Sequence, residues 1–124
     1  MIPADITALA VSPKSAAYCA GTMAGALQIV SEEGKKSRFS PSFKSPIELV
    51  AWSWDETYLA IARFGNSISV RAAEPAAADE GKMLDEKLDA PVRQLLFNKS
   101  SNLLFDATPH SLYIWAIEGH SFDS

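Results

Sequence analysis

Residues that could carry chemistry are few and scattered in this sequence of 124 residues. Cys19 is the only cysteine, and its apolar surroundings, AYCAG, favour a small buried side chain over a nucleophile. His110 lies in the turn-like stretch TPHS, and His120 lies near the end of the sequence. Neither histidine has His, Cys or carboxylate partners at the spacing that a metal site needs. The sequence therefore predicts no catalytic residue and no metal site, and we expect no enzyme.

The pair Gly21 and Gly25, in GTMAG, is the nearest match to a phosphate-binding loop. A phosphate-binding loop continues into Lys-Ser or Lys-Thr and a helix, and neither follows here. The stretch is therefore interpreted as a β-turn, and no cofactor is expected.

The composition excludes several classes of partner. Apolar residues make up 48%, enough for the core of one domain, and the net charge is −4 with no basic cluster, so nucleic acid is not expected. No apolar run approaches the roughly 20 residues of a membrane helix, and no basic leader precedes an apolar stretch. A lone cysteine allows no intrachain disulfide, which favours an intracellular, cytoplasmic protein.

Three copies of one pattern fill the chain, beginning at Ile6, Ile47 and Val92, 41 and 45 residues apart. Each copy has three short runs that alternate apolar and polar residues and are rich in β-branched and aromatic types. Polar turns separate the runs, for example SPKS, SWDE and NKSS. A period of about 40 to 45 residues is typical of the blades of a β-propeller.

More polar segments lie between the copies, at Lys35–Phe43 and Lys82–Leu88. Charge and a proline are tolerated on the outer edge strand of a sheet, so these segments are predicted to be the fourth strands of the first two blades. A helix over Ala78–Asp89 is the competing interpretation, which Gly81 disfavours. Residues 72–81 are expected to form a loop.

The three copies resemble WD repeats, on the segments ITALAVSPKSAAYCAG, IELVAWSWDETYLA and PVRQLLFNKSSNLLF. The amino-acid sequence of these segments is most similar to the propeller region of fungal NACHT–WD-repeat proteins. The resemblance implies an all-β fold, a partial β-propeller of three four-stranded blades in one domain, residues 1–124. The blades would span about 6–43, 47–88 and 92–118, the third without its outer strand.

The sequence departs from a well-formed WD repeat, in which buried His, Asp and Trp side chains share hydrogen bonds. The second turn of each copy has no Asp, and Trp115 is the only Trp at a repeat end. We therefore expect this polar network to be absent and apolar packing to replace it. The expected core residues are Leu9, Val11, Leu49, Trp52, Leu59, Ile61, Leu95, Phe97, Leu104, Ile114 and Trp115.

A ring of blades does not close with three, because closed propellers typically have four to eight. The chain is therefore expected to be a fragment of a larger protein, or a half-ring completed by other copies or another subunit. Either way, apolar faces of the first and third blades would stay uncovered, and the isolated chain should self-associate or need a partner.

The function implied by the resemblance is a non-catalytic protein-interaction scaffold, with a protein or the missing blades as partner. The NACHT resemblance would make it the sensing region of a signalling NTPase. Candidate contact residues are Arg63 and Phe64 in the turn ARFGN and Trp54 in SWDE. Phe64 could instead fold inward, and Trp54 could cap a blade edge. The alternative function is a segment of a quinoprotein-like propeller enzyme whose active-site residues come from missing blades.

Overall fold

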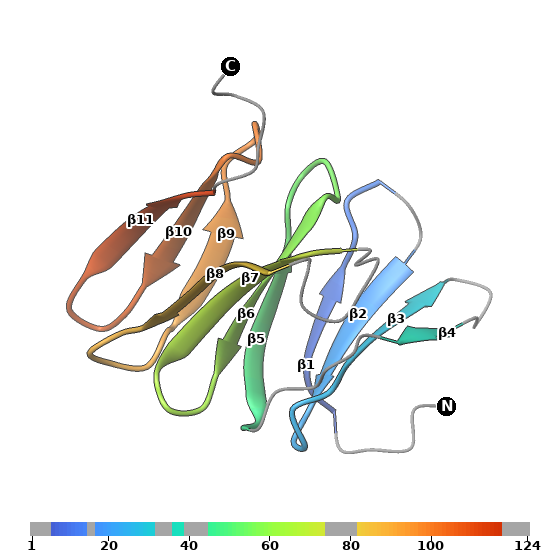
Figure 1. The fold of residues 1–124 in the computed structure, drawn as a ribbon, viewed down its shortest axis with the longest axis horizontal. Coiled ribbons are helices and arrows are strands. Elements are labelled where there is room, and N and C mark those ends of the chain that lie inside the picture. Colours follow the sequence, from blue (N-terminus) through green and yellow to red (C-terminus); the bar gives the residue numbers. More distant parts are fainter. Residues whose placement is uncertain (1–5, 15–16, 32–35, 39–44, 74–81, 118–124) are drawn as a thin grey trace.

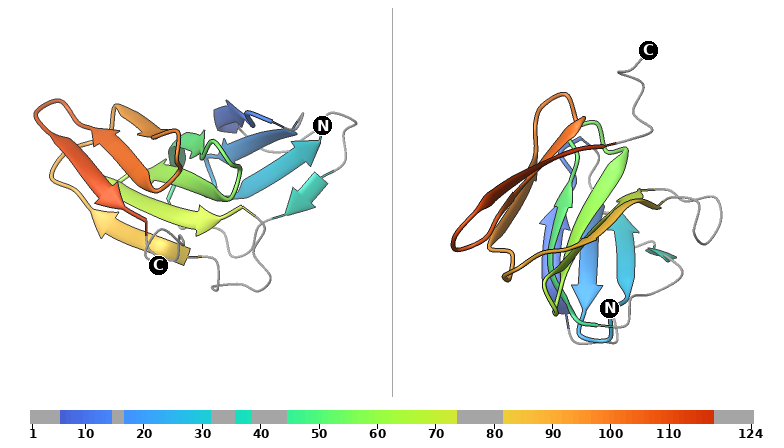
Figure 2. Two further views of the ribbon diagram at one scale, coloured as in Figure 1. Left: turned by 90° about the horizontal axis from the view of Figure 1, so that it is seen from above. Right: turned by 60° about the vertical axis from the view of Figure 1, so that its left-hand side comes forward.

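A computed structural model describes residues 6–14, 17–31, 36–38, 45–73 and 82–117. In this part of the chain, eleven strands form three antiparallel sheets that stand side by side (Figures 1 and 2). The strands are β1 (Ile6–Val11), β2 (Ala17–Thr22), β3 (Leu27–Ser31), β4 (Lys36–Arg38), β5 (Ile47–Trp52), β6 (Tyr58–Arg63), β7 (Ser67–Ala72), β8 (Lys82–Lys87), β9 (Gln94–Phe97), β10 (Leu103–Ala107) and β11 (Leu112–Ala116).

Each sheet is a simple meander, and we call them blade 1 (β1 to β4), blade 2 (β5 to β8) and blade 3 (β9 to β11). The all-β, three-bladed fold is confirmed, and the described part of blade 3 has three strands. A strand, β8, occupies Lys82–Lys87, where a helix was the competing interpretation. In blade 1 only Lys36–Arg38 is paired as β4. Residues 39–43 of that predicted strand, and most of the predicted loop at 72–81, lie outside the described residues.

The turn between the first two strands is built in the same way in every blade. A Ser or Asn donates its backbone N–H to the carbonyl five residues later, and its side-chain oxygen accepts the N–H of that same residue. The pairs are Ser12–Ala17, Ser53–Tyr58 and Asn98–Leu103. Glu56 and Ser101 take the left-handed conformation at equivalent places, with φ of 64° and 65°. The same turn therefore recurs in each blade because a Ser or Asn side chain makes the same backbone hydrogen bond there.

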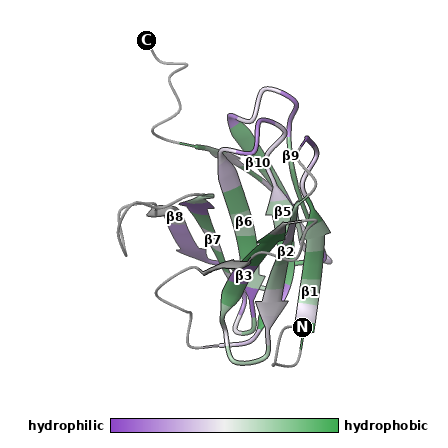
Figure 3. Cartoon of the chain, turned by 90° about the vertical axis from the view of Figure 1, so that its right-hand side faces the viewer, coloured by the Kyte–Doolittle hydropathy of each residue, from purple (hydrophilic) through white to green (hydrophobic). Residues whose placement is uncertain are grey.

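The first strands β1, β5 and β9 lie next to one another, and the blades pack through two apolar cores. Blades 1 and 2 meet around Cys19, Ile47 and Leu59, and blades 2 and 3 around a larger group that includes Val70 and Leu104. Figure 3 shows hydrophobic residues along β1 and β6 and hydrophilic ones on β8, an outer edge strand. The charged edge discourages pairing with other chains.

The expected core is wrong at three positions. Leu9, Val11 and Ile114 are 64%, 63% and 57% exposed. Leu9 and Val11 lie on the face of blade 1 that points away from blade 2, and Ile114 lies on the face of blade 3 that points away from blade 2. The alternating pattern placed these side chains on a sheet face, but no described blade covers that face. Leu59, Ile61, Leu95, Phe97 and Leu104 are buried as expected.

Blade 3 holds a buried Asp–Trp pair that was not anticipated from the sequence, although no histidine of the described residues takes part in it as in the WD-repeat network. Asp106 in β10 is fully buried, and Trp115 Nε1 in β11 donates to its Oδ2 at 2.9 Å. The pair lies against the apolar core shared with blade 2. Burial raises the pKa of Asp106 above its ordinary value, although the bond from Trp115 partly opposes this shift.

Candidate protein-interaction site

The residues first considered for catalysis have no catalytic setting in the structure. Cys19 is fully buried in β2 at the seam between blades 1 and 2, and burial raises the pKa of its thiol to about 12. His110 lies exposed in the turn between β10 and β11, and His120 lies outside the described residues. Within the ranges that the structure describes, no three His, Cys, Asp or Glu side chains are grouped so as to hold a metal ion.

No helix in the described part of the chain is long and apolar enough to cross a bilayer.

A thiol held in this way should be inert while the chain is folded. We expect Cys19 to react with a thiol reagent such as dithionitrobenzoate only after denaturation, because both burial and its raised pKa suppress the reactive thiolate. The measurement is the rate of labelling in buffer and in urea. Fast labelling of the native chain, at the rate of a free thiol, would contradict the position assigned to Cys19.

Phe64 lies at the tip of the hairpin between β6 and β7 and is 65% exposed. Gly65 and Asn66 both have positive φ, 97° and 66°, in the three-residue turn between the paired residues Arg63 and Ser67. The N–H of Phe64 donates to the carbonyl of Pro46 at 2.9 Å, which fixes the turn against the start of β5. Phe64 therefore does not fold inward against a described blade, and its side chain is exposed at the turn.

A hollow of about 680 Å³ lies beside this ring, where blades 1 and 2 meet. Glu48 on β5 is the one charged residue in its lining, and it makes no ion pair with the part of the chain that is described. Among the lining residues, Thr7 Oγ1 donates a hydrogen bond to the carbonyl of Ile47, which connects β1 to β5. We call this surface the Phe64 groove; its lining residues are Thr7, Met23, Pro46, Ile47, Glu48 and Phe64.

Met23 was not singled out from the sequence, although it is 54% exposed and lines the groove with Phe64. The signal that could have found it is the repeat itself. Met23 precedes Phe64 by 41 residues, the same interval that separates Ile6 from Ile47. The two residues are thus equivalent turn positions of neighbouring blades, both occupied by large apolar side chains.

Arg63 lies beside Phe64 in sequence but does not line the groove. Its Nη2 lies 3.0 Å from Asp85 Oδ1 in β8, and only 17% of its side chain is exposed. Ser69 Oγ donates to the same carboxylate oxygen at 3.1 Å. Arg63 therefore connects β6 to the outer strand of its own blade, and its guanidinium has a structural partner.

Trp54 lies at the other end of β6 from Phe64, in the turn that follows β5. Its Nε1 donates to the carbonyl of Phe97 at 3.2 Å, and Lys99 Nζ lies 5.6 Å from its ring centre. Trp52 Nε1 likewise donates to the carbonyl of Ala10 at 3.1 Å. Each indole therefore joins its blade to a neighbour, so Trp54 caps a seam while remaining 47% exposed.

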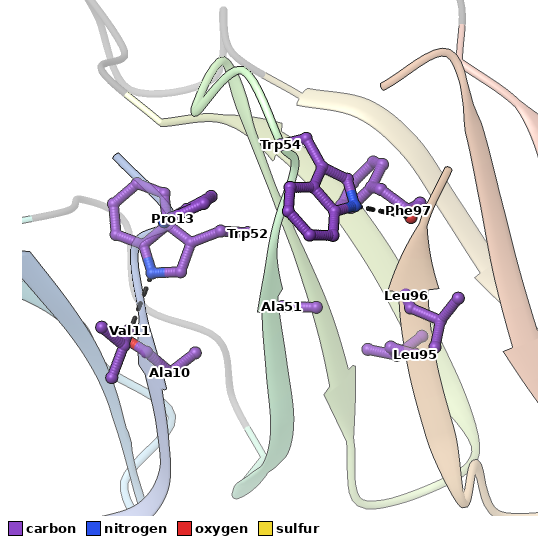
Figure 4. Close-up of a pocket in the computed structure, with 9 residues that line it drawn as sticks. All are labelled: Ala10, Val11, Pro13, Ala51, Trp52, Trp54, Leu95, Leu96 and Phe97. Atoms are coloured by element: carbon purple, nitrogen blue, oxygen red, sulfur yellow. Dashed lines mark hydrogen bonds between the residues drawn. The ribbon is translucent and has the colours of Figure 1, made fainter. Parts of the chain in front are cut away.

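Both indoles line a second, smaller hollow of about 300 Å³ across β1, β5 and β9, which we call the tryptophan groove (Figure 4). The three candidate contact residues are thus not brought together. The six-residue strand β6 begins after the Trp54 turn and ends at Arg63, next to Phe64, and spans about 20 Å at the usual rise per residue.

Comparison with solved structures agrees with the blade architecture. The chain is similar to the RRP9 WD40 repeats and to U3-55K, each with a TM-score of 0.75 at 19% identity over 94% of the chain. It is also similar to the β-propeller domain of Myceliophteria thermophila Cps50 (Swd1), with a TM-score of 0.74 at 18% identity over 95% of the chain.

The chain covers only 36% or 37% of the length of each of these proteins. A scan of protein-family models finds no match, and neither does a search of curated protein sequences. At such low identity the likeness establishes the fold. The chain therefore has the fold of three consecutive blades of a WD40 β-propeller.

Proposed function

We propose that this chain is a non-catalytic protein-interaction module and that the Phe64 groove is its contact site. The observation that carries the proposal is the exposure of Phe64 and Met23, 65% and 54%, on hairpin tips. Large apolar side chains presented by a fixed backbone bind partners at little entropic cost. Hairpin tips also lie outside the sheet faces through which blades pack, so neighbouring blades would leave the groove open.

The chemistry of the groove indicates the kind of partner. Its floor and walls are apolar except for Thr7 and Glu48, and Glu48 is an exposed carboxylate at the edge. A peptide segment that places an apolar side chain in the groove and an adjacent Lys or Arg near Glu48 would satisfy both features. The overall charge of −4 also favours a cationic partner.

The experiment begins with selection of displayed random peptides on the immobilised chain. We expect enriched peptides to share an apolar residue next to Lys or Arg, and Phe64→Ala to weaken their binding at least about tenfold. Fluorescence polarisation measures the affinity. The melting midpoint should stay within a degree or two, because an exposed side chain contributes little to folding.

Matched controls separate this groove from the rest of the surface. His110→Ala alters an exposed turn residue of blade 3 and should leave binding unchanged. Glu48→Gln should weaken binding and reduce its dependence on salt. Equal binding by wild type and Phe64→Ala would place the contact elsewhere, and a large fall in the midpoint would show that Phe64 supports the fold.

A finer proposal concerns the protein in which the module works. The likeness of its three segments to fungal NACHT–WD-repeat proteins supports a role as the sensing or scaffolding end of a signalling NTPase. The single cysteine supports an intracellular location. The alternative, a segment of a quinoprotein-like enzyme, predicts a bound cofactor or calcium ion that native mass spectrometry of the purified protein would detect.

A further inference from the structure

Each blade has two apolar faces. We call the face that points toward the next blade along the chain the leading face, and the opposite face the trailing face. The leading face of blade 1, which includes the paired residues Cys19 and Ile29, packs on the trailing face of blade 2. The leading face of blade 2 then packs on the trailing face of blade 3, around Ala60, Val70 and Leu104. Both seams of the described chain therefore join a leading face to a trailing face.

Two faces stay open, one of each kind. The leading face of blade 3 carries Leu112 and Ile114, which are 62% and 57% exposed. A hollow of about 250 Å³ lies on it, lined by Gln94, Leu96, Phe105, Ala107 and Leu112. The trailing face of blade 1 carries Leu9 and Val11, 64% and 63% exposed, together with Tyr18. Their exposure agrees with the prediction that the end blades are uncovered.

The open faces match the faces that are already joined inside the chain. The pair Phe105–Ile114 occupies in blade 3 the register that Ala60–Val70 occupies in blade 2. Across β1 to β3 of blade 1 and the three strands of blade 3, the open faces contain no charged residue, so joining them over these strands would desolvate no ion. By register, the leading face of blade 3 is Gln94, Leu96, Phe105, Ala107, Leu112 and Ile114, and the trailing face of blade 1 is Leu9, Val11, Tyr18, Ala20, Gln28 and Val30. The pairing of β3 with β4 adds Lys36 and Arg38 at the outer edge of the blade 1 face.

We infer that the leading face of blade 3 binds the trailing face of blade 1 in a second copy of this chain. The contact is head-to-tail, so the same contact made twice closes a ring of two chains. Such a ring contains six blades, within the range of four to eight found in closed propellers. The occupant is a second copy because this chain itself presents both complementary faces, and its internal seams show how they pack.

The test combines two variants that place opposite charges on the two faces. Leu9→Lys alters the trailing face of blade 1, and Leu112→Glu alters the leading face of blade 3. Both residues are exposed in the single chain, so circular dichroism and the melting midpoint at high dilution should match wild type. Light scattering coupled to size exclusion, or sedimentation velocity, measures the mass over a tenfold dilution series.

We expect wild type to have the mass of two chains and each variant alone to have the mass of one, with association weakened at least about tenfold. An equimolar mixture of the two variants should recover the mass of two chains, because one seam is unaltered and the other joins opposite charges. Face-to-face pairing through blade 3 alone would instead leave Leu9→Lys dimeric, which would overturn the head-to-tail arrangement.

Two other results would overturn the inference. Wild type with the mass of one chain at every concentration would show that a second copy does not cover these faces. Masses that grow beyond two chains would show that the head-to-tail contact does not close into a ring.

Discussion

Gly21→Val should lower the free energy of unfolding by about 3 kcal/mol, because the site is already in contact with the next blade. A Cβ atom built on Gly21 would lie 2.4 Å from Ile47 Cγ2 and 2.8 Å from Ile47 Cβ. Gly21 is in β2, on the face of blade 1 that meets blade 2, and Ile47 is fully buried. Any side chain at residue 21 must therefore push the two blades apart.

Urea unfolding followed by tryptophan fluorescence measures the loss. A double-mutant cycle with Ile47→Ala tests its cause, since the substitution removes Cγ2, the atom at 2.4 Å, although the Cβ at 2.8 Å remains. Ile47→Ala alone should be destabilising by about 2 to 5 kcal/mol, and the double variant should lose less than the sum. Strictly additive losses would show that contact with Ile47 is not the reason glycine is needed.

Gly65→Ala is the matched control at the other kind of glycine position. No heavy atom lies within 4 Å of a Cβ built there, but the φ of Gly65 is +97°. Its expected loss is about 1 to 2 kcal/mol, from backbone strain alone, and Ile47→Ala should not change it.

The blade architecture could be predicted because it depends on local signals. Alternation predicts strands, and the turn after the first strand is specified by side chains such as Ser53 and Asn98 that bond to the backbone five residues later. These signals recur at the repeat interval, so strand positions are fixed without knowledge of distant contacts. Leu59 and Leu104 are buried as expected, because each lies at a seam where a neighbouring blade covers its sheet face.

Burial at the ends of the array could not be predicted in the same way. Leu9, Val11 and Ile114 have the pattern of core residues, yet they are exposed because burial also requires a neighbouring blade. Periodicity shows which residues share a face but does not show what covers that face. Leu9 is thus wrong as a core residue of this chain for the same reason that it is useful in a test of assembly.

The candidate site was predicted in part for similar reasons. The sequence indicated Phe64 as an unusual turn residue, but its direction depends on the turn fixed by Gly65 and Asn66. Arg63 was grouped with Phe64 because the two are adjacent in sequence. Its ion-pair partner Asp85 is distant in sequence and comes close only because β6 and β8 belong to the same sheet. The indole of Trp54 donates a hydrogen bond to blade 3, as a cap would, and a role as a partner contact stays a prediction.

The buried carboxylate of blade 3 leads to the second large effect. Trp115→Phe should lower the free energy of unfolding near neutral pH by about 2 to 3 kcal/mol, since a hydrogen bond to a buried charged group is lost. Trp115 Nε1 is the donor to Asp106 Oδ2, and Asp106 Oδ1 has no hydrogen-bond partner in the described residues. A phenyl ring keeps an aromatic group next to Tyr113, whose ring centre lies 6.0 Å from that of Trp115.

The dependence on pH distinguishes this loss from a simple loss of packing. Burial raises the pKa of Asp106 in the folded chain, so at pH values between the ordinary and the raised pKa the folded state holds a proton that the unfolded state has released. The contribution of Asp106 to stability is therefore fully present below the ordinary pKa of an aspartate and is lost as the pH rises through the raised value. Without the bond from Trp115, which lowers this pKa, the loss should extend to higher pH.

Melting and urea unfolding at about pH 4 and about pH 8 measure both effects. The destabilisation by Trp115→Phe should be smaller at the lower pH, where Asp106 is neutral and needs its donor less. Asp106→Asn cannot ionise, so in that background the cost of Trp115→Phe should become nearly independent of pH. An equal loss at both pH values in the native background would show that Trp115 acts through packing alone, and the Asp106–Trp115 pair would then carry no charge-dependent stability.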